Sequence, residues 1–144
     1  MTGLLIAVCL SLLVPQPADS CENASASDVA KAFAIAYEAG DPSAADYVFF
    51  TGKHVPEMGG TPEELRDELL PAELRKHRKD PAEVIMEEIR FSPMDNRYGH
   101  DVYYVVYLAR GTKHTLCLHQ IERAWKVDIS YLWMGDWYDW MPGY

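Results

Sequence analysis

The sequence predicts an α+β domain in which N-terminal helices pack on a curved antiparallel sheet. Two patterns carry this prediction: residues 100–133 alternate with the period of two that strands require, and residues 27–40 repeat apolar side chains with the period of a helix. The chain has 144 residues, of which 49% are hydrophobic and 24% charged. This is enough apolar material for one core, so we expect a single domain.

Residues 1–20 have the pattern of a signal peptide. An uncharged apolar run over residues 4–14 is followed by prolines, and Ala18-Asp19-Ser20 places small residues where a signal peptidase reads them. The run is too short for a membrane-spanning helix, which needs about 20 residues. No Lys or Arg precedes the run, and the alternative is a short buried segment of the core. We expect an exported protein that is secreted or periplasmic.

Cleavage after Ser20 would leave Cys21 and Cys117 in an oxidising compartment. In one interpretation they form a disulfide, which typically stabilises a fold by about 2–4 kcal/mol. In another, Cys21 is the first mature residue and carries lipid, because Ser20-Cys21 resembles the end of the cleavage box of bacterial lipoproteins. The box usually has other residues in place of Ala18 and Asp19, so we favour the disulfide or a free secreted form. A membrane would be a partner only in the lipidated case.

Residues 21–26 form a linker, and an amphipathic helix is predicted over residues 27–40. Ser27 or Asp28 can cap its start, and Gly40 can end it. Its apolar stripe consists of Val29, Ala32, Phe33, Ala36 and Tyr37.

Two further helices are expected before the sheet. A short one starts at Asp41-Pro42, and a longer one starts at Thr61, where a capping residue precedes a proline and two glutamates. Pro71 is expected to break the longer helix in two. Residues 53–60 have no periodicity and contain two glycines, so we expect them to form a loop.

The remaining chain predicts four strands. The first covers residues 84–91 and is followed by a turn signal at residues 93–96. The other three lie within residues 100–133 and are joined by short turns at residues 110–113 and 122–124. The apolar parity of the first strand consists of Ile85, Ile89 and Phe91, and that of the last consists of Trp125, Val127, Ile129, Tyr131 and Trp133.

The composition argues against several classes of partner and of active site. The formal net charge is −9, which leaves no excess of cations for a nucleic acid or an anionic membrane surface. No signature of a Ser-His-Asp triad or of a thiol nucleophile is present. The histidines lack the spacing of metal ligands, and we predict neither a metal site nor a cofactor. They are His54, His77, His100, His114 and His119.

Order and pattern together resemble a known fold family. The first predicted helix ends in AFAIAYEAGD, a helical middle follows, and the last strand carries WKVDIS. In this the chain is similar to the nuclear-transport-factor-two-like, cystatin-like superfamily, and within it to small exported bacterial proteins of unknown function. The resemblance covers residues 27–133 and implies a cone-shaped domain whose sheet wraps around the first helix and leaves a pocket at the open end. The superfamily includes isomerases, dehydratases and binding domains, so the resemblance assigns no function.

An enzyme of the ketosteroid-isomerase type would need a carboxylate base and a hydroxyl group or protonated acid in an apolar cavity. None of the residues that could serve lies in a motif that can be carried over from that family. Asp128 and His119 have a simpler interpretation as a surface acid and a strand-side histidine. The pocket candidates are Tyr37, Asp46, Tyr104 and His119.

Residues 134–144 form an aromatic C-terminal tail. So many large aromatic side chains must be buried or form an exposed patch, and exposed patches of that kind bind partners. The tail either folds back to close the open end of the cone or contacts a sugar or another protein. The interaction candidates are Trp133, Trp137, Tyr138 and Trp140.

Two functions are consistent with these features. The first is an exported, non-catalytic binding or protein-interaction module of the cell envelope. Its partner would be a cationic protein, as for an immunity-type antagonist of a toxin, or a small apolar ligand. The second is a small-molecule isomerase or hydro-lyase. The aromatic tail, the acidic charge and the lack of a catalytic signature favour the first.

Overall fold

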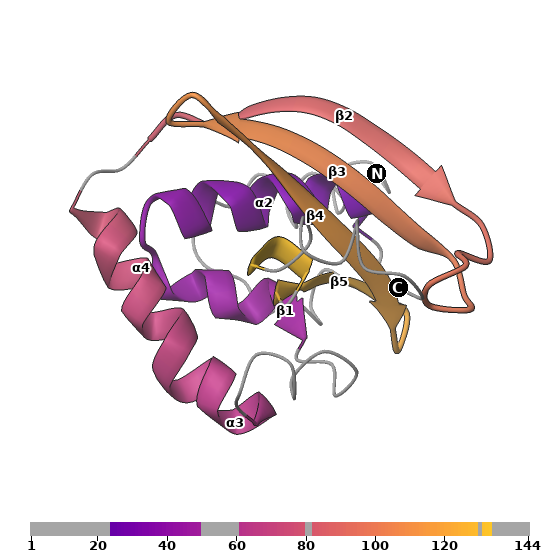
Figure 1. Ribbon diagram of the computed structural model, residues 1–144, viewed down its shortest axis with the longest axis horizontal. Coiled ribbons are helices and arrows are strands. Elements are labelled where there is room, and N and C mark those ends of the chain that lie inside the picture. Colours follow the sequence, from indigo (N-terminus) through magenta and orange to yellow (C-terminus); the bar gives the residue numbers. More distant parts are fainter. Residues whose placement is uncertain (1–23, 50–60, 80–81, 130, 134–144) are drawn as a thin grey trace, which may run out of the picture.

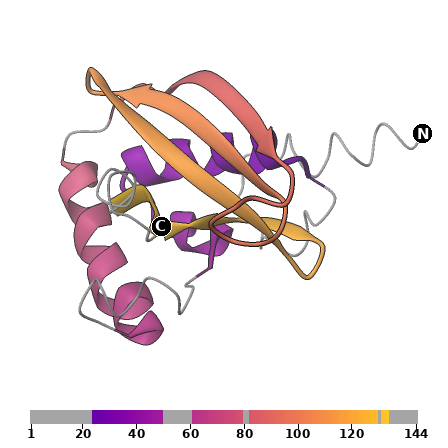
Figure 2. The same ribbon diagram turned by 45° about the vertical axis from the view of Figure 1, so that its right-hand side comes forward.

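A five-stranded sheet curves over one long helix, as Figures 1 and 2 show. The computed structural model describes residues 24–49, 61–79, 82–129 and 131–133. The strands, in chain order, are β1 (Val48–Phe49), β2 (Ile85–Ser92), β3 (Val102–Ala109), β4 (Thr112–Ile121) and β5 (Ala124–Asp128). They lie in the sheet in the order β1-β5-β4-β3-β2. The predicted α+β class is confirmed.

The long helix is α2 (Ala26–Glu38), which begins slightly earlier than predicted. Its N-cap is Ser25 rather than Ser27 or Asp28, because the Ser25 hydroxyl oxygen accepts a hydrogen bond from the backbone N–H of Asp28 (3.2 Å). The helix ends where predicted, since Gly40 follows it with a φ of 70°.

A short 3₁₀ helix, η2 (Pro42–Tyr47), follows as expected, with Asp41 as its N-cap. It leads into β1, a strand that the sequence pattern did not predict. β1 pairs with β5 in parallel, so the sheet is mixed rather than wholly antiparallel.

The helix predicted at Thr61 is confirmed, but Pro71 does not break it. α3 (Pro62–Glu64), the π-helical turn η4 (Leu65–Leu69) and α4 (Leu70–Arg78) follow one another without a gap. The Thr61 hydroxyl oxygen accepts from the N–H of Glu64 (3.2 Å). A proline ring clashes with the carbonyl four residues before it, and the wider turn just ahead of Pro71 accommodates the ring without ending the helix.

Three antiparallel strands follow β2 as predicted, but their connections are tighter than expected. β3 and β4 are joined at Arg110-Gly111, and β4 and β5 at Glu122-Arg123. All four turn residues have φ between 50° and 73°, the left-handed pair of conformations that matches the twist of a two-residue hairpin.

The last strand is shorter than predicted. β5 ends at Asp128, and residues 129 and 131–133 are helical. The Asp128 side chain explains the change, because its Oδ1 accepts a hydrogen bond from the backbone N–H of Tyr131 (3.4 Å), as the N-cap of a helix does. Tyr131 and Trp133 therefore do not share a strand face with Trp125.

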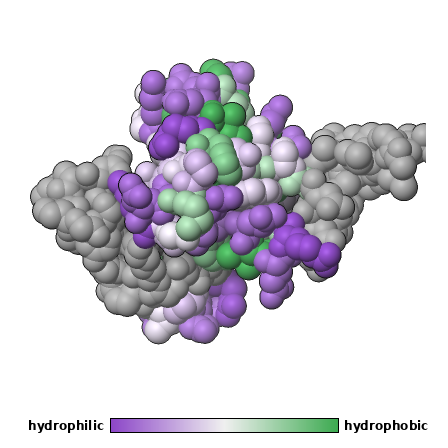
Figure 3. Space-filling view, turned by 90° about the vertical axis from the view of Figure 1, so that its right-hand side faces the viewer, coloured by the Kyte–Doolittle hydropathy of each residue, from purple (hydrophilic) through white to green (hydrophobic). Residues whose placement is uncertain are grey.

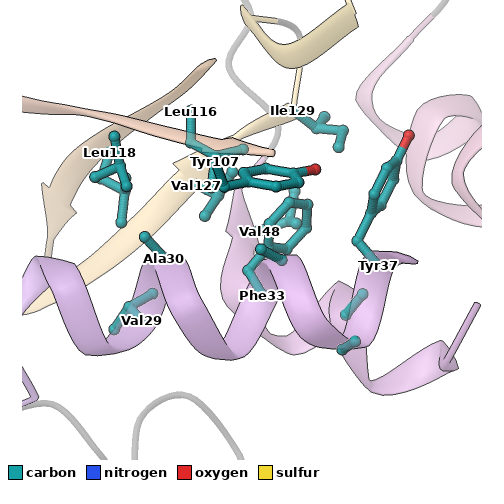
Figure 4. Close-up of a cluster of buried hydrophobic side chains, with 14 of the residues drawn as sticks. Val29, Ala30, Phe33, Tyr37, Val48, Tyr107, Leu116, Leu118, Val127 and Ile129 are labelled. Atoms are coloured by element: carbon teal, nitrogen blue, oxygen red, sulfur yellow. The ribbon is translucent and has the colours of Figure 1, made fainter. Parts of the chain in front are cut away.

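The main core lies between α2 and the concave face of the sheet (Figure 4). Phe33 on α2 and Tyr107 on β3 are fully buried there. The strands β4 and β5 complete this core with Leu116, Leu118 and Val127. The opposite face of the sheet carries a smaller buried cluster of Val102, Tyr104, Cys117 and Tyr131.

Gly40 sets how closely α4 can lie against the end of α2. A Cβ atom on Gly40 would lie 2.3 Å from the carbonyl oxygen of Leu74 and 2.5 Å from the backbone nitrogen of Arg78. The Arg78 guanidinium also donates to the Gly40 carbonyl oxygen (3.1 Å).

We expect Gly40→Ala to lower the free energy of unfolding by at least about 2 kcal/mol, because backbone atoms of α4 would have to move. Gly111→Ala is the matched control: its φ is 73°, but nothing lies within 4 Å of the added Cβ, so the loss should be about 1 kcal/mol. Urea unfolding of both variants measures the difference, and equal losses would contradict this role of Gly40.

Candidate functional site

A buried carboxylate joins three elements at the C-terminal end of α2. The Glu38 side chain is 1% exposed and forms an ion pair with Arg110, which follows β3. Tyr107 donates from its hydroxyl group to Glu38 Oε2 (2.8 Å), and His77 Nδ1 on α4 lies 3.3 Å from Oε1. We call these four residues the Glu38 network. The sequence pattern did not predict this network, although Glu38 follows Ala30 and Ala34 at helical spacing on a buried stripe.

Tyr37, a predicted pocket residue, lies beside the Glu38 network. Its hydroxyl oxygen accepts from Nε1 of Trp133 (3.0 Å), and its ring contacts His77 with centroids 4.6 Å apart. Burial raises the pKa of Tyr37 to about 12. Trp133, a predicted interaction residue, is thus half-buried and bonded inside the protein.

A second polar cluster lies on the convex face of the sheet, away from α2. His119 on β4 is 3% exposed, and its Nε2 lies 3.3 Å from Oδ2 of Asp128. Its Nδ1 lies 2.7 Å from Nε2 of His100. The interpretation of Asp128 as a surface acid is wrong: the residue is fully buried, since β5 places it against β4 on this face.

Cys117 belongs to the same cluster, with its Sγ atom 3.5 Å from Nε2 of His119. It is a free and fully buried thiol in this structure, so the expected disulfide with Cys21 is not supported. Cys21 itself lies outside the described residues. Burial raises the pKa of the Cys117 thiol far above its ordinary value, which leaves it protonated and a poor nucleophile.

A pocket of about 480 Å³ opens where the β2–β3 loop meets the convex face. Tyr104 lines it, and its hydroxyl donates to Oδ2 of Asp95 (2.9 Å). Asp95 also accepts from the Ser92 hydroxyl (2.8 Å) and from the backbone N–H of Arg97 (2.9 Å). Burial alone would raise the pKa of Asp95, but these hydrogen bonds hold it below its ordinary value.

The four predicted pocket residues do not meet in one place. Tyr104 lines the pocket and His119 lies in the neighbouring convex-face cluster, whereas Tyr37 is on the opposite side of the sheet. Asp46 is exposed on η2, where its backbone oxygen accepts from Nζ of Lys126 (3.1 Å).

Strand β2 exposes large apolar side chains instead of burying them. Ile89 and Phe91 are each 46% exposed, on the concave face beyond the reach of α2. The Phe91 ring contacts Tyr103, and Tyr103 contacts Trp125, each with centroids 4.9 Å apart. We call Ile89, Phe91, Tyr103 and Trp125 the aromatic strip. Ile89 and Phe91 belong to the apolar parity predicted for the first strand, and both are about half exposed.

The predicted parity of β2 is also interrupted. A register shift between Met86 and Glu88 pairs Ile85 with Leu108 but Ile89 with Val105. Leu108 and Val105 point to opposite faces of β3, so Ile85 lies on the other face from Ile89.

Several predicted features lie outside the described residues. They are the signal peptide at 1–20, Cys21, the loop at 53–60, and Trp137, Tyr138 and Trp140 of the tail at 134–144.

Comparison with known protein families, with curated proteins and with solved structures finds no match to this chain. Within the described ranges, no three His, Cys, Asp or Glu side chains are arranged to hold a metal ion. None of the helices described here has the length and apolar character that a membrane span requires.

We expect Arg110→Met to lower the free energy of unfolding by about 3–5 kcal/mol, because it leaves the buried Glu38 carboxylate without its cation. The double variant Arg110→Met/Glu38→Gln should recover part of that loss, since the neutral amide needs no counter-charge. Urea unfolding of both proteins tests this, and a loss below about 1 kcal/mol in the single variant would show that the ion pair contributes little.

We expect the protein to lose stability at alkaline pH, because Tyr37 is buried. Tyr37 keeps its proton in the folded state up to about pH 12, whereas an ordinary tyrosine ionises near 10.0. Because the folded pKa is raised, the contribution to stability is complete below pH 10.0 and is lost as the pH rises towards 12. Urea unfolding and phenolate absorbance, followed together, should show the loss of stability in that window, with a smaller loss in Tyr37→Phe. Ionisation of every tyrosine near 10.0 with the fold intact would contradict it.

Proposed function

We propose that this protein is a non-catalytic protein-interaction module that binds its partner along strand β2. One observation carries the proposal: in the sheet of the described residues β2 is an edge strand of eight residues, whose Ile85, Ile89 and Phe91 are about half exposed, at 51%, 46% and 46%. Large apolar side chains on an unpaired edge are a liability unless something covers them.

The backbone of β2 supports this mode of binding. β2 is the last strand of the described sheet and pairs with β3 on one side. After the register shift at Met86, residues 88–92 continue as a regular strand. An extended segment of a partner can add to such an edge through main-chain hydrogen bonds. Every second side chain of that segment would then contact the side chains of β2.

The aromatic strip supplies side-chain contacts next to this edge. Phe91, Tyr103 and Trp125 form a continuous row of rings that runs from β2 across the concave face. Figure 3 looks at the side of the molecule that carries the β2–β3 loop and shows apolar side chains reaching the surface among hydrophilic ones. Aromatic side chains are enriched among the residues that dominate binding energies at protein interfaces.

Charge favours a cationic partner. The chain has a formal net charge of −9, and Glu83, Glu87 and Glu88 lie exposed at or beside β2. Glu87 contacts Lys113 (3.3 Å), whose side chain is 70% exposed, so this ion pair contributes little to stability. We therefore propose a basic, extended segment as the bound element, in an exported protein whose role is that of an immunity-type antagonist or a similar envelope binder.

We also propose that the fold is the cone of the nuclear-transport-factor-two-like superfamily. The curvature of the sheet around α2 supports it (Figure 1). In the described residues the concave side is filled by core side chains such as Phe33 and Tyr107, which is why we place the binding surface at the edge.

The isomerase or hydro-lyase alternative has one observation in its favour, the meeting of Asp95 and Tyr104 at the pocket wall (2.9 Å). We rank it second because the Tyr104 hydroxyl donates to the carboxylate itself, and the Asp95 oxygens already accept from Ser92 and Arg97. A general base needs a carboxylate that can reach the proton of a substrate.

The test is a photo-crosslinking amino acid at position 91 in the full chain, produced in its own cells. We expect a defined crosslinked partner, and Ile89→Lys should lower its yield at least about fivefold, because an interface contact of this kind is worth about 1 kcal/mol or more.

Position 69 is the matched control. Leu69 is 43% exposed on η4 and lies far from β2 in the fold, so a crosslinker there should give no such product, and Leu69→Lys should leave the yield at position 91 unchanged. The same product from both positions, or no effect of Ile89→Lys, would refute binding along β2.

A further inference from the structure

We infer that the pocket under the β2–β3 loop binds a small organic oxyanion, a carboxylate or phosphate group carried by a metabolite-sized molecule. Its volume of about 480 Å³ lies in the range of small-molecule sites. It opens on the convex face, because Arg90 and Tyr104 pair across β2 and β3 on the side opposite to Phe91 and Tyr103. The aromatic strip proposed for the partner lies on the other face.

Two arginines line the pocket, although the chain as a whole is acidic. Arg90 and Arg97 line it together with a single acid, Asp95. The Asp95 carboxylate is directed into the loop, where Ser92, Tyr104 and the backbone of Arg97 donate to it. These hydrogen bonds hold its charge away from the opening, so the Arg90 guanidinium, exposed on β2, is the charge that a ligand would meet.

Both guanidinium groups lie over tyrosine rings. The Cζ atom of Arg90 is 4.6 Å from the Tyr104 ring centroid, and that of Arg97 is 5.8 Å from the Tyr131 ring centroid. The two rings are themselves 5.6 Å apart. Stacking on the Tyr104 ring orients the Arg90 guanidinium without occupying its in-plane N–H groups, and those groups match the two oxygens of a carboxylate or phosphate. Within the described residues Arg90 forms no ion pair with an acid.

The loop that frames the pocket is held in one shape before any ligand arrives. The backbone N–H of Met94 donates to Asp101 Oδ1 (2.8 Å), and that of Asp95 donates to the carbonyl of His100 (2.9 Å). Gly99 N–H closes the turn on the Asp95 carbonyl (2.7 Å). A preformed site loses less conformational entropy on binding, so a ligand making few contacts can still bind.

Isothermal titration of the full chain with benzoate, phenyl phosphate and the neutral analogue benzamide tests the inference. We expect one or both anions to bind at least about tenfold more tightly than benzamide, with affinity that falls as salt is added. The tighter of the two anions identifies carboxylate or phosphate as the preferred group. If neither anion binds more tightly than benzamide, the inference is wrong.

Variants locate the site. Arg90→Met should weaken anion binding about tenfold, and Arg90→Lys should fall between, because lysine keeps the charge but not the two-pronged geometry. Arg75→Met, on the exposed face of α4, is the matched control and should bind like the unmodified chain. Unchanged affinity in Arg90→Met would refute the site.

Chemical-shift mapping on the unmodified chain does not depend on any variant folding. Backbone amide signals of residues 90–92 and 94–97 should shift on addition of the tighter anion and stay unchanged with benzamide. Shifts confined to other parts of the chain would overturn the assignment.

Discussion

The fold depends on placing one carboxylate where water cannot reach it. Glu38 is fully buried at the end of α2, and a buried carboxylate without donors would cost several kcal/mol. Its donors come from distant parts of the chain, Tyr107 and Arg110 at the end of β3 and His77 on α4. The carboxylate therefore has its partners only when α2, the β3–β4 hairpin and α4 are packed together. The Glu38 network thus depends on the tertiary structure and not on local contacts.

Local sequence signals predicted most of the helices and strands. The elements that were not predicted depend on contacts between residues far apart in the sequence. Thr61 and Gly40 act through their own backbone neighbours, so the helix start at Thr61 and the end of α2 were predictable. The end of β5 was not predictable, because the alternating pattern from Trp125 to Trp133 continues past Asp128. The strand ends there because the Asp128 carboxylate caps the helical turn that follows. β1 has two residues and exists because β5 lies beside it, a neighbour that no local pattern reveals.

The site was less predictable than the fold for a similar reason. The strand register places the pocket candidates Tyr104 and His119 on one face of the sheet, a pairing that the sequence did not predict. Nor could the sequence show that Asp95 and Arg97 would meet at the pocket that Tyr104 lines, because they reach the sheet through a loop with no period. Nor could it show that Tyr37 and Trp133 would bond to each other across most of the chain. The concave interior is occupied by such contacts, which leaves the rim and the convex face for binding.

The two edges of the sheet are unlike each other, and this limits how the protein can assemble. One edge is β2, with eight residues, and the other is β1, with two. A sheet with two long edges can receive a strand on one side and offer a fresh edge on the other, which is the geometry of open-ended fibres. In the part of the chain that the structure describes, which stops at Phe49 and resumes at Thr61, the second edge is too short to continue the stack. Strand addition at β2 would thus end after one step and give a closed complex of fixed stoichiometry instead of a growing polymer.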